Sequence, residues 1–288
     1  MDHVQTVRWL PRRLPGVEVV AEHPEPHADR RVRLDGGYGI KITPGGAPPP
    51  VHHRGRVHGE AGSGLVTVVE PDEVVSSAGG GPDAHPLTRI LVVDASLLPA
   101  GGRADRSRFR ELRYRDHDLF DDIAALHGLL AEDDDALTLQ SALTGVLDRL
   151  VTRHAVSSHP SGAPPRHRAL REVRPSARSA GRSAGRQIGL DELASVAGCG
   201  KHHLIRSFQH AYGVPPHRYR NLVRLARAKE MPAAGKSVAE VAGELGFFDQ
   251  SHLNRHFRQP FGMSAGAFAR PSGSPPRSLL APPPPAAR

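Results

Sequence analysis

The chain has 288 residues, 38 Lys and Arg against 30 Asp and Glu, a formal net charge of +8, 18 His and one Cys. This length is enough for two modest domains, each with its own core. The positive charge favours a polyanionic partner over an anionic small substrate. The single cysteine, Cys199, excludes an internal disulfide framework and a thiolate zinc site, and it is typical of a reducing compartment.

No stretch approaches the roughly 18 apolar residues needed to span a bilayer. The first residues, MDHVQTVRWLPRRLPG, lack the apolar centre of a signal peptide. We therefore expect a cytoplasmic protein without a membrane partner.

Short runs rich in β-branched residues, separated by Gly and Pro, occupy residues 32 to 98. They include Tyr38–Thr43, Leu65–Val69 and Leu87–Val93. Such runs bounded by turn formers predict a small β-sandwich or barrel.

Helical periodicity begins after Arg115. Apolar residues recur every three or four positions in two stretches, Leu119 to Leu130 and Leu139 to Leu150, with the acidic run Glu132–Asp135 between them. The pattern predicts an antiparallel helix pair whose polar turn supplies carboxylates to the second helix. The two apolar faces either cover the β-domain or form the seam of a homodimer. We place the first domain at residues 1–155.

Residues 157 to 186 are mainly Pro, Ser, Ala and Gly with seven arginines, opposed by Glu172 alone. This composition predicts a disordered basic linker over residues 156–186. The Pro-rich residues 271–288 are expected to form a disordered tail.

A duplication lies within residues 187–270. Leu204, Phe208, Gly213 and Tyr219 recur 49 positions later as Leu253, Phe257, Gly262 and Phe268. Upstream, Ala194 and Gly198 recur 48 positions later as Ala242 and Gly246. Six matching positions are too many to arise by chance. The spacing between equivalent residues rises from 48 before the turn to 49 after it, so the turn of the second copy contains one inserted residue.

Each copy has the pattern of two helices joined by a tight turn. A short amphipathic helix ends at Gly198 or Gly246, because glycine adopts positive φ readily. Asp249 is placed to cap the next helix of the second copy, whereas Gly200 is a weaker cap in the first.

The second helix of each copy is predicted to bury its Leu and Phe and to expose the residues between them. Arg206 and Arg255 occupy equivalent positions in both copies, which favours phosphate anchoring, and Arg224 and Arg258 are assigned the same role. Residues that differ between the copies suit base reading. These are Lys201, His202, Gln250, Ser251 and Asn254.

One helix, Pro216 to Met231, is predicted between the copies, with Tyr219, Leu222, Leu225 and Ala226 facing inward. Sixteen residues give a rod of roughly 24 Å, comparable with the roughly 34 Å between successive major-groove turns. Residues 201 to 231 contain seven Lys and Arg and one acid, which supplies the electrostatic attraction that nucleic acid binding needs.

These residues resemble the DNA-binding domain of the AraC/XylS family. The copies read LDELASVAGCGKHHLIRSFQHAYGVPPHRYRNLVRLARAKEM and SVAEVAGELGFFDQSHLNRHFRQPFGMSAGAFAR. The resemblance implies an AraC-type domain over residues 187–270 that binds adjacent major grooves of promoter DNA and contacts or recruits RNA polymerase.

The N-terminal part is similar to the cupin-type sensor domain of that family through Tyr38-Gly-Ile, Arg54-Gly55 and the segment around Leu126-His127. This similarity implies an α+β protein of two domains, with a cupin-like β-barrel that binds a small-molecule effector. Val75 stands where many relatives have His, which counts against a metal. Pro232 should end the linking helix at about Met231, because proline lacks the N–H that the helix needs.

No catalytic triad, phosphate loop or dinucleotide fingerprint occurs in the required context. We therefore expect no enzyme activity, no cofactor and no metal, although His252 and His256 have the spacing of a zinc pair. Two alternatives to a regulator stay open: a metal-dependent cupin-like enzyme fused to a DNA-binding module, and an architectural DNA-binding protein without sequence preference.

Overall fold

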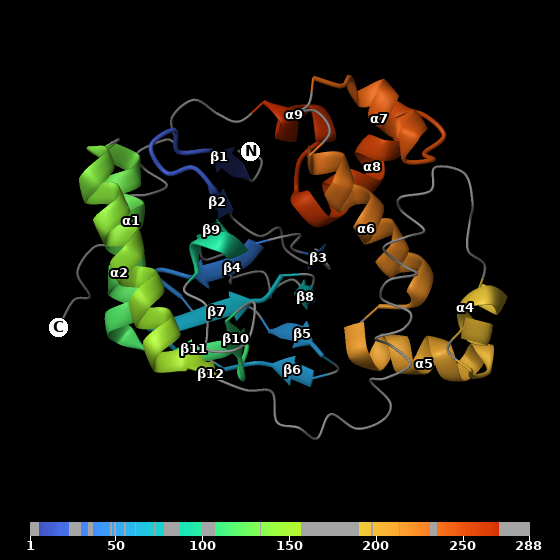
Figure 1. Ribbon diagram of the computed structural model, residues 1–288, viewed down its shortest axis with the longest axis horizontal. Coiled ribbons are helices and arrows are strands. Elements are labelled where there is room, and N and C mark those ends of the chain that lie inside the picture. Colours follow the sequence, from blue (N-terminus) through green and yellow to red (C-terminus); the bar gives the residue numbers. More distant parts are fainter. Residues whose placement is uncertain are drawn as a thin grey trace.

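The computed structural model describes residues 6–22, 30–33, 37–46, 48, 50–54, 56–60, 62–71, 73–77, 87–98, 107–132, 134–156, 190–196, 198–212, 214–230 and 235–270. It contains an N-terminal domain of sheets covered by a helix pair and a C-terminal lobe of helices (Figure 1). The predicted two-domain α+β architecture is confirmed. The predicted linker and tail lie outside the described residues, apart from Val156, which is in a strand.

Two antiparallel sheets account for most strands of the N-terminal domain. The larger has six strands within the described ranges, in the order β1 (Val7–Trp9), β2 (Val17–Glu22), β9 (Thr88–Asp94), β4 (Gly37–Ile42), β7 (Leu65–Val69) and β11 (Arg113–Arg115). The smaller has the order β3 (Arg30–Arg33), β8 (Val74–Ser77), β5 (Val51–His53) and β6 (Arg56–His58). A short pair joins β10 (Arg108–Phe109) to β12 (Ala155–Val156), and a 3-10 turn, η1 (Ala95–Leu97), follows β9.

The three predicted extended runs correspond to β4, β7 and β9. Over the residues described, the pairings make open sheets, and no closed ring of strands forms.

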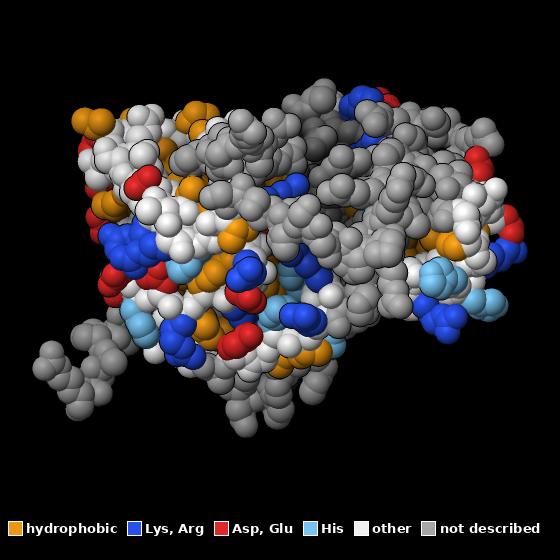
Figure 2. Space-filling model, turned by 60° about the horizontal axis from the view of Figure 1, so that its bottom comes forward, with side chains coloured by type: hydrophobic (Ala, Val, Ile, Leu, Met, Phe, Trp, Pro, Cys, Tyr) orange, Lys and Arg blue, Asp and Glu red, His pale blue; other side chains and the backbone are white. Residues whose placement is uncertain are grey.

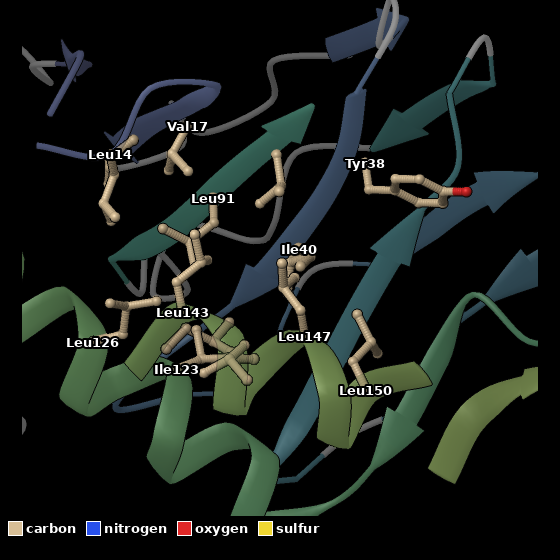
Figure 3. Packing of buried hydrophobic residues seen from close by; sticks show 14 of the residues in the cluster. Leu14, Val17, Tyr38, Ile40, Leu91, Ile123, Leu126, Leu143, Leu147 and Leu150 are labelled. Carbon is tan, nitrogen blue, oxygen red and sulfur yellow. The ribbon is translucent and has the colours of Figure 1, made fainter. Parts of the chain in front are cut away.

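Helices α1 (His117–Glu132) and α2 (Ala136–His154) pack against the larger sheet. Figure 3 shows Ile123 and Leu126 of α1 and Leu143 of α2 facing Ile40 and Leu91 from the sheet. Burying each such side chain stabilises the fold by about 1.5–3 kcal/mol.

The predicted carboxylate at the turn between these helices is Asp135. It caps α2 by accepting from the backbone N–H groups of Leu137 and Thr138, at 2.9 and 3.0 Å. Since the apolar faces of both helices are buried on the sheet of their own chain, the covering role is the one observed. These two stripes are not available as a dimer seam.

The C-terminal lobe consists of two helical units that share α6. Its described helices are α4 (Leu190–Val196), α5 (Lys201–Tyr212), α6 (Pro216–Glu230), α7 (Val238–Glu244), α8 (Gln250–Phe261) and α9 (Ala265–Ala269). Leu222 and Val223 of α6 pack in the first unit around Phe208, whereas Leu225 and Ala228 pack in the second. Because one helix contributes to both cores, it holds the units in a fixed relation.

The N-terminal domain touches both helical units. Val74 of β8 packs in the same cluster as Phe208 and Tyr219 of the first unit. At the second unit, the guanidinium of Arg8 lies 3.8 Å from the ring centroid of Phe268 and donates to the Phe268 carbonyl at 2.8 Å. Arg8 is held in place by Glu18, 2.7 Å from its Nε.

Candidate nucleic-acid interface

The turn of each helical unit is built on a glycine with positive φ. Gly198 has φ of +60° and Gly246 has φ of +71°, a region that other L-residues avoid. In the second unit, the Asp249 carboxylate accepts from the backbone N–H of His252 at 2.6 Å and so caps α8. The predicted turns and the predicted cap are confirmed.

Helices α5 and α8 bury equivalent residues. Leu204 and Phe208 of α5 and Leu253 and Phe257 of α8 are almost fully buried. Helical spacing therefore turns the intervening side chains away from the core.

The outward face of α5 carries three of the predicted contact residues, Lys201, His202 and Arg206, and all are exposed. Lys201 Nζ lies 2.6 Å from the Asp191 carboxylate of α4, but both side chains are largely in solvent. Such a pair contributes little and is easily exchanged for a phosphate. Figure 2 shows basic, histidine and acidic side chains together at the right-hand end, where Figure 1 places α4 and α5.

The outward face of α8 carries Gln250, Ser251, Arg255 and Arg258, all exposed. This set combines amide, hydroxyl and guanidinium groups, which are the chemistry of base-edge and phosphate contacts.

Asn254 makes a contact within the lobe that was not predicted. Its Oδ1 accepts from the backbone N–H of Ala265 at 3.0 Å, at the start of α9. The amide oxygen keeps a second acceptor site, so base reading by Asn254 stays a prediction. The hydrogen bond also joins α8 to the segment that follows it.

We expect Asn254→Ala to lower the free energy of unfolding by about 1–3 kcal/mol, because the buried N–H of Ala265 loses its acceptor. Ser251→Ala, on the exposed face of the same helix, should change it by less than about 0.5 kcal/mol. Urea denaturation of the full chain measures both. An unchanged stability for Asn254→Ala, with altered preference at one base pair, would favour the base-reading role over the structural one.

A chain of hydrogen bonds ties α8 to α6. The backbone N–H of Phe248 donates to His252 Nδ1 at 3.2 Å, the Nε2 atoms of His252 and His256 are 3.0 Å apart, and His256 Nδ1 lies 3.3 Å from the Asn221 side chain. The Nδ1 atoms of both rings accept, that of His252 from the Phe248 N–H and that of His256 from the Asn221 Nδ2 amide.

The surroundings of His256 favour its neutral form. Burial lowers the pKa of His256, and the neighbouring His252 and Arg255 lower it further. Among the described residues, no group of three His, Cys, Asp or Glu is placed to hold a metal ion. Their hydrogen bonds make the two histidines parts of the joint between α8 and α6.

A basic groove of about 400 Å³ lies between α6 and α8. Its lining contains no carboxylate and comprises Val214, His217, Arg218, Arg220, Asn221, Leu222, Arg224, Leu225, His256, Gln259 and Pro260. Burial lowers the pKa of Arg224, and the adjacent Arg220 adds to this effect. Arg224, predicted to contact phosphate, is half-buried in this groove.

The fold and this interface define a two-domain protein with paired helix-turn-helix units. Residues 193–271 match the family described as a helix-turn-helix domain. YbfI, an HTH-type transcriptional regulator of Bacillus subtilis, is 27% identical over 137 residues, 48% of this chain and 49% of YbfI. The chain thus spans about half the length of that relative. These similarities place a helix-turn-helix domain in the region where the two helical units lie.

Two structures of ToxT from Vibrio cholerae have a similar fold along most of the chain. An apo ToxT variant has a TM-score of 0.55 at 12% identity, covering 89% of this chain and 97% of ToxT. Wild-type ToxT with bound unsaturated fatty acid has a TM-score of 0.53 at 12% identity, covering 95% and 98%. At this identity the likeness concerns the fold.

Proposed function

We propose that the chain is a sequence-specific regulator of transcription that binds double-stranded promoter DNA. The observation that carries the proposal is the pair of exposed polar helix faces, on α5 and α8, held by one shared helix. The 15 residues of α6 span about 22 Å, which suits two recognition helices in neighbouring major grooves.

Individual roles in this proposal follow from exposure and charge. Lys201 and His202 of α5, and Gln250 and Ser251 of α8, read base edges. Phosphates are contacted by the arginines of the lobe, namely Arg206, Arg224, Arg255 and Arg258. The groove that contains Arg224 lies between the recognition helices and suits the strand that passes from one groove to the next.

The decisive experiment compares a base-reading residue with a phosphate anchor. Arg255→Ala should weaken binding to all duplexes alike and reduce the slope of log K against log salt by about 0.9. Gln250→Ala should instead change the preference at one or two base pairs, by about 1–3 kcal/mol. Competition titrations at several salt concentrations measure both effects.

Arg12→Ala provides the control, because Arg12 is exposed on the N-terminal domain. It should leave affinity and salt dependence unchanged. Uniform protection of unrelated DNA in a footprint, with no preferred site, would favour the architectural alternative and reject sequence-specific regulation.

We further propose that the N-terminal domain, over residues 1–155, is a cupin-like sensor of a small-molecule effector. The support is its two-sheet architecture and the fold shared with ToxT, which has been crystallised with an unsaturated fatty acid. A thermal shift of the full chain with fatty acids tests this idea. We also propose that the protein contacts RNA polymerase, that it forms a homodimer and that it has no enzyme activity. None of the described helices is long and apolar enough to cross a membrane.

A further inference from the structure

Phe248 is the most exposed of the large apolar side chains in the described part of the chain. It is 91% exposed, whereas the adjacent Phe247 is 7% exposed and packs in the core of the second unit. An aromatic ring left in water keeps a large apolar surface available for a partner. The role of this ring is not explained by the core or by the contacts assigned above.

The backbone that presents Phe248 is fixed on both sides. The N–H of Phe247 donates to the Ala242 carbonyl at 2.9 Å, and the N–H of Phe248 donates to His252 Nδ1 at 3.2 Å. The next residue, Asp249, caps α8. The exposed ring therefore belongs to an ordered turn, and its position relative to α8 is set by hydrogen bonds.

Phe248 lies two residues before Gln250, at the end of the helix that the proposed function places against base edges. In helix-turn-helix proteins the first residues of the recognition helix meet the bases. The major groove offers one apolar feature on a base edge, the C5 methyl group of thymine. An apolar ring at this position matches that group and none of the polar edges.

We propose that Phe248 packs against the C5 methyl of a thymine in the half-site read by α8, and so contributes to sequence preference. This inference rests on the proposed function. In the first unit Cys199 corresponds to Phe247, because their N–H groups donate to the equivalent carbonyls of Ala194 and Ala242, and Phe248 is the residue inserted in the second turn. The methyl contact is therefore confined to one half-site.

The test is a double-mutant cycle on the full chain. Single thymines of the preferred duplex are replaced by deoxyuridine, which removes only the methyl group, and binding is measured for wild type and Phe248→Ala. At one position, uracil should weaken wild-type binding about fourfold, the value for one buried methyl. Phe248→Ala should bind the thymine duplex at least as weakly as wild type binds the uracil duplex. Replacing that thymine by uracil should cause no further loss of affinity in the variant.

Two outcomes overturn the inference. If Phe248→Ala binds the thymine site as tightly as wild type, the ring serves another surface. If uracil costs the wild type and the variant equally at every position, the ring does not touch a methyl group. Phe248→Leu should retain part of the methyl dependence, because it keeps an apolar side chain.

The proposed function is tested separately within the same titrations. Failure of Arg255→Ala to weaken binding, on any duplex, rejects the DNA interface itself. A normal loss with Arg255→Ala and no methyl dependence at Phe248 rejects only the thymine contact. Thermal denaturation of Phe248→Ala should match wild type, since the ring contributes almost nothing to the core.

Discussion

Phe257→Ala is expected to destabilise the second helical unit by about 3–5 kcal/mol, the range for removing a buried aromatic ring. The Phe257 side chain is fully buried in α8. Its ring centroid lies 4.4 Å from that of Phe261 and 5.4 Å from that of Phe268. Removing it leaves a cavity between α8 and α9 that the neighbouring rings fill only in part.

Urea denaturation of the full chain measures this loss, and Phe248→Ala is the matched control. Both substitutions replace a phenylalanine by alanine. Phe248 lies just before α8 and is exposed, whereas Phe257 lies within α8 and is buried. A loss below about 1 kcal/mol for Phe257→Ala would mean that the unit is packed less tightly than the structure shows. Such a result would also weaken the case for a rigid α8.

Stability of the full chain is expected to fall by about 3 kcal/mol as the pH drops from 6.5 to 4, through His127 alone. The ring is fully buried in α1, and its Nδ1 lies 2.8 Å from the Ile123 carbonyl. None of the described residues gives its buried Nε2 a hydrogen-bond partner. Burial lowers the pKa of His127 to about 4, with a smaller contribution from the charge of Arg89.

The direction of this effect follows from which state binds the proton. Between pH 6.5 and pH 4 the unfolded chain holds a proton on His127 and the folded chain does not, so acidification favours unfolding. Below the folded pKa both states are protonated and the loss stops growing. The dependence fades as the pH rises above 6.5, because the unfolded chain then also loses the proton.

His127→Leu should flatten the dependence of the unfolding free energy on pH in that window. His203→Leu makes the same substitution at an exposed position of α5 and should leave the dependence unchanged. Denaturant titrations at several pH values give the comparison. Equal slopes for wild type and His127→Leu would show that other groups account for the acid sensitivity.

The local features of the helical units were predictable, since they depend on neighbouring residues. Gly246 and Asp249 determine the turn and the cap through backbone conformation and one short-range hydrogen bond. Helical periodicity was enough to predict the burial of Leu253 and Phe257.

Features that depend on partners distant in sequence were not predictable. Asn254 is on the accessible side of α8 by periodicity, but the segment that follows brings the Ala265 N–H to it. The link between His256 and Asn221 joins residues 35 positions apart. Arg224 has the polarity of an outward residue, yet α8 approaches α6 closely enough to place it in a groove. The exposed Phe248 differs, because the sequence itself contains a local signal for it. Two phenylalanines are adjacent in the turn, and only one of them, Phe247, packs in the core.

The hydrogen bond from Arg8 to the Phe268 carbonyl joins the first strand described, β1, to the last helix described, α9. A fragment restricted to residues 187–270 would lose this guanidinium and would also lose Val74 from the core of the first unit. The affinity of this fragment for DNA would then be that of the helical lobe without the contacts of the N-terminal domain. The ratio between fragment and full-length affinities would measure how strongly the N-terminal domain restrains DNA binding.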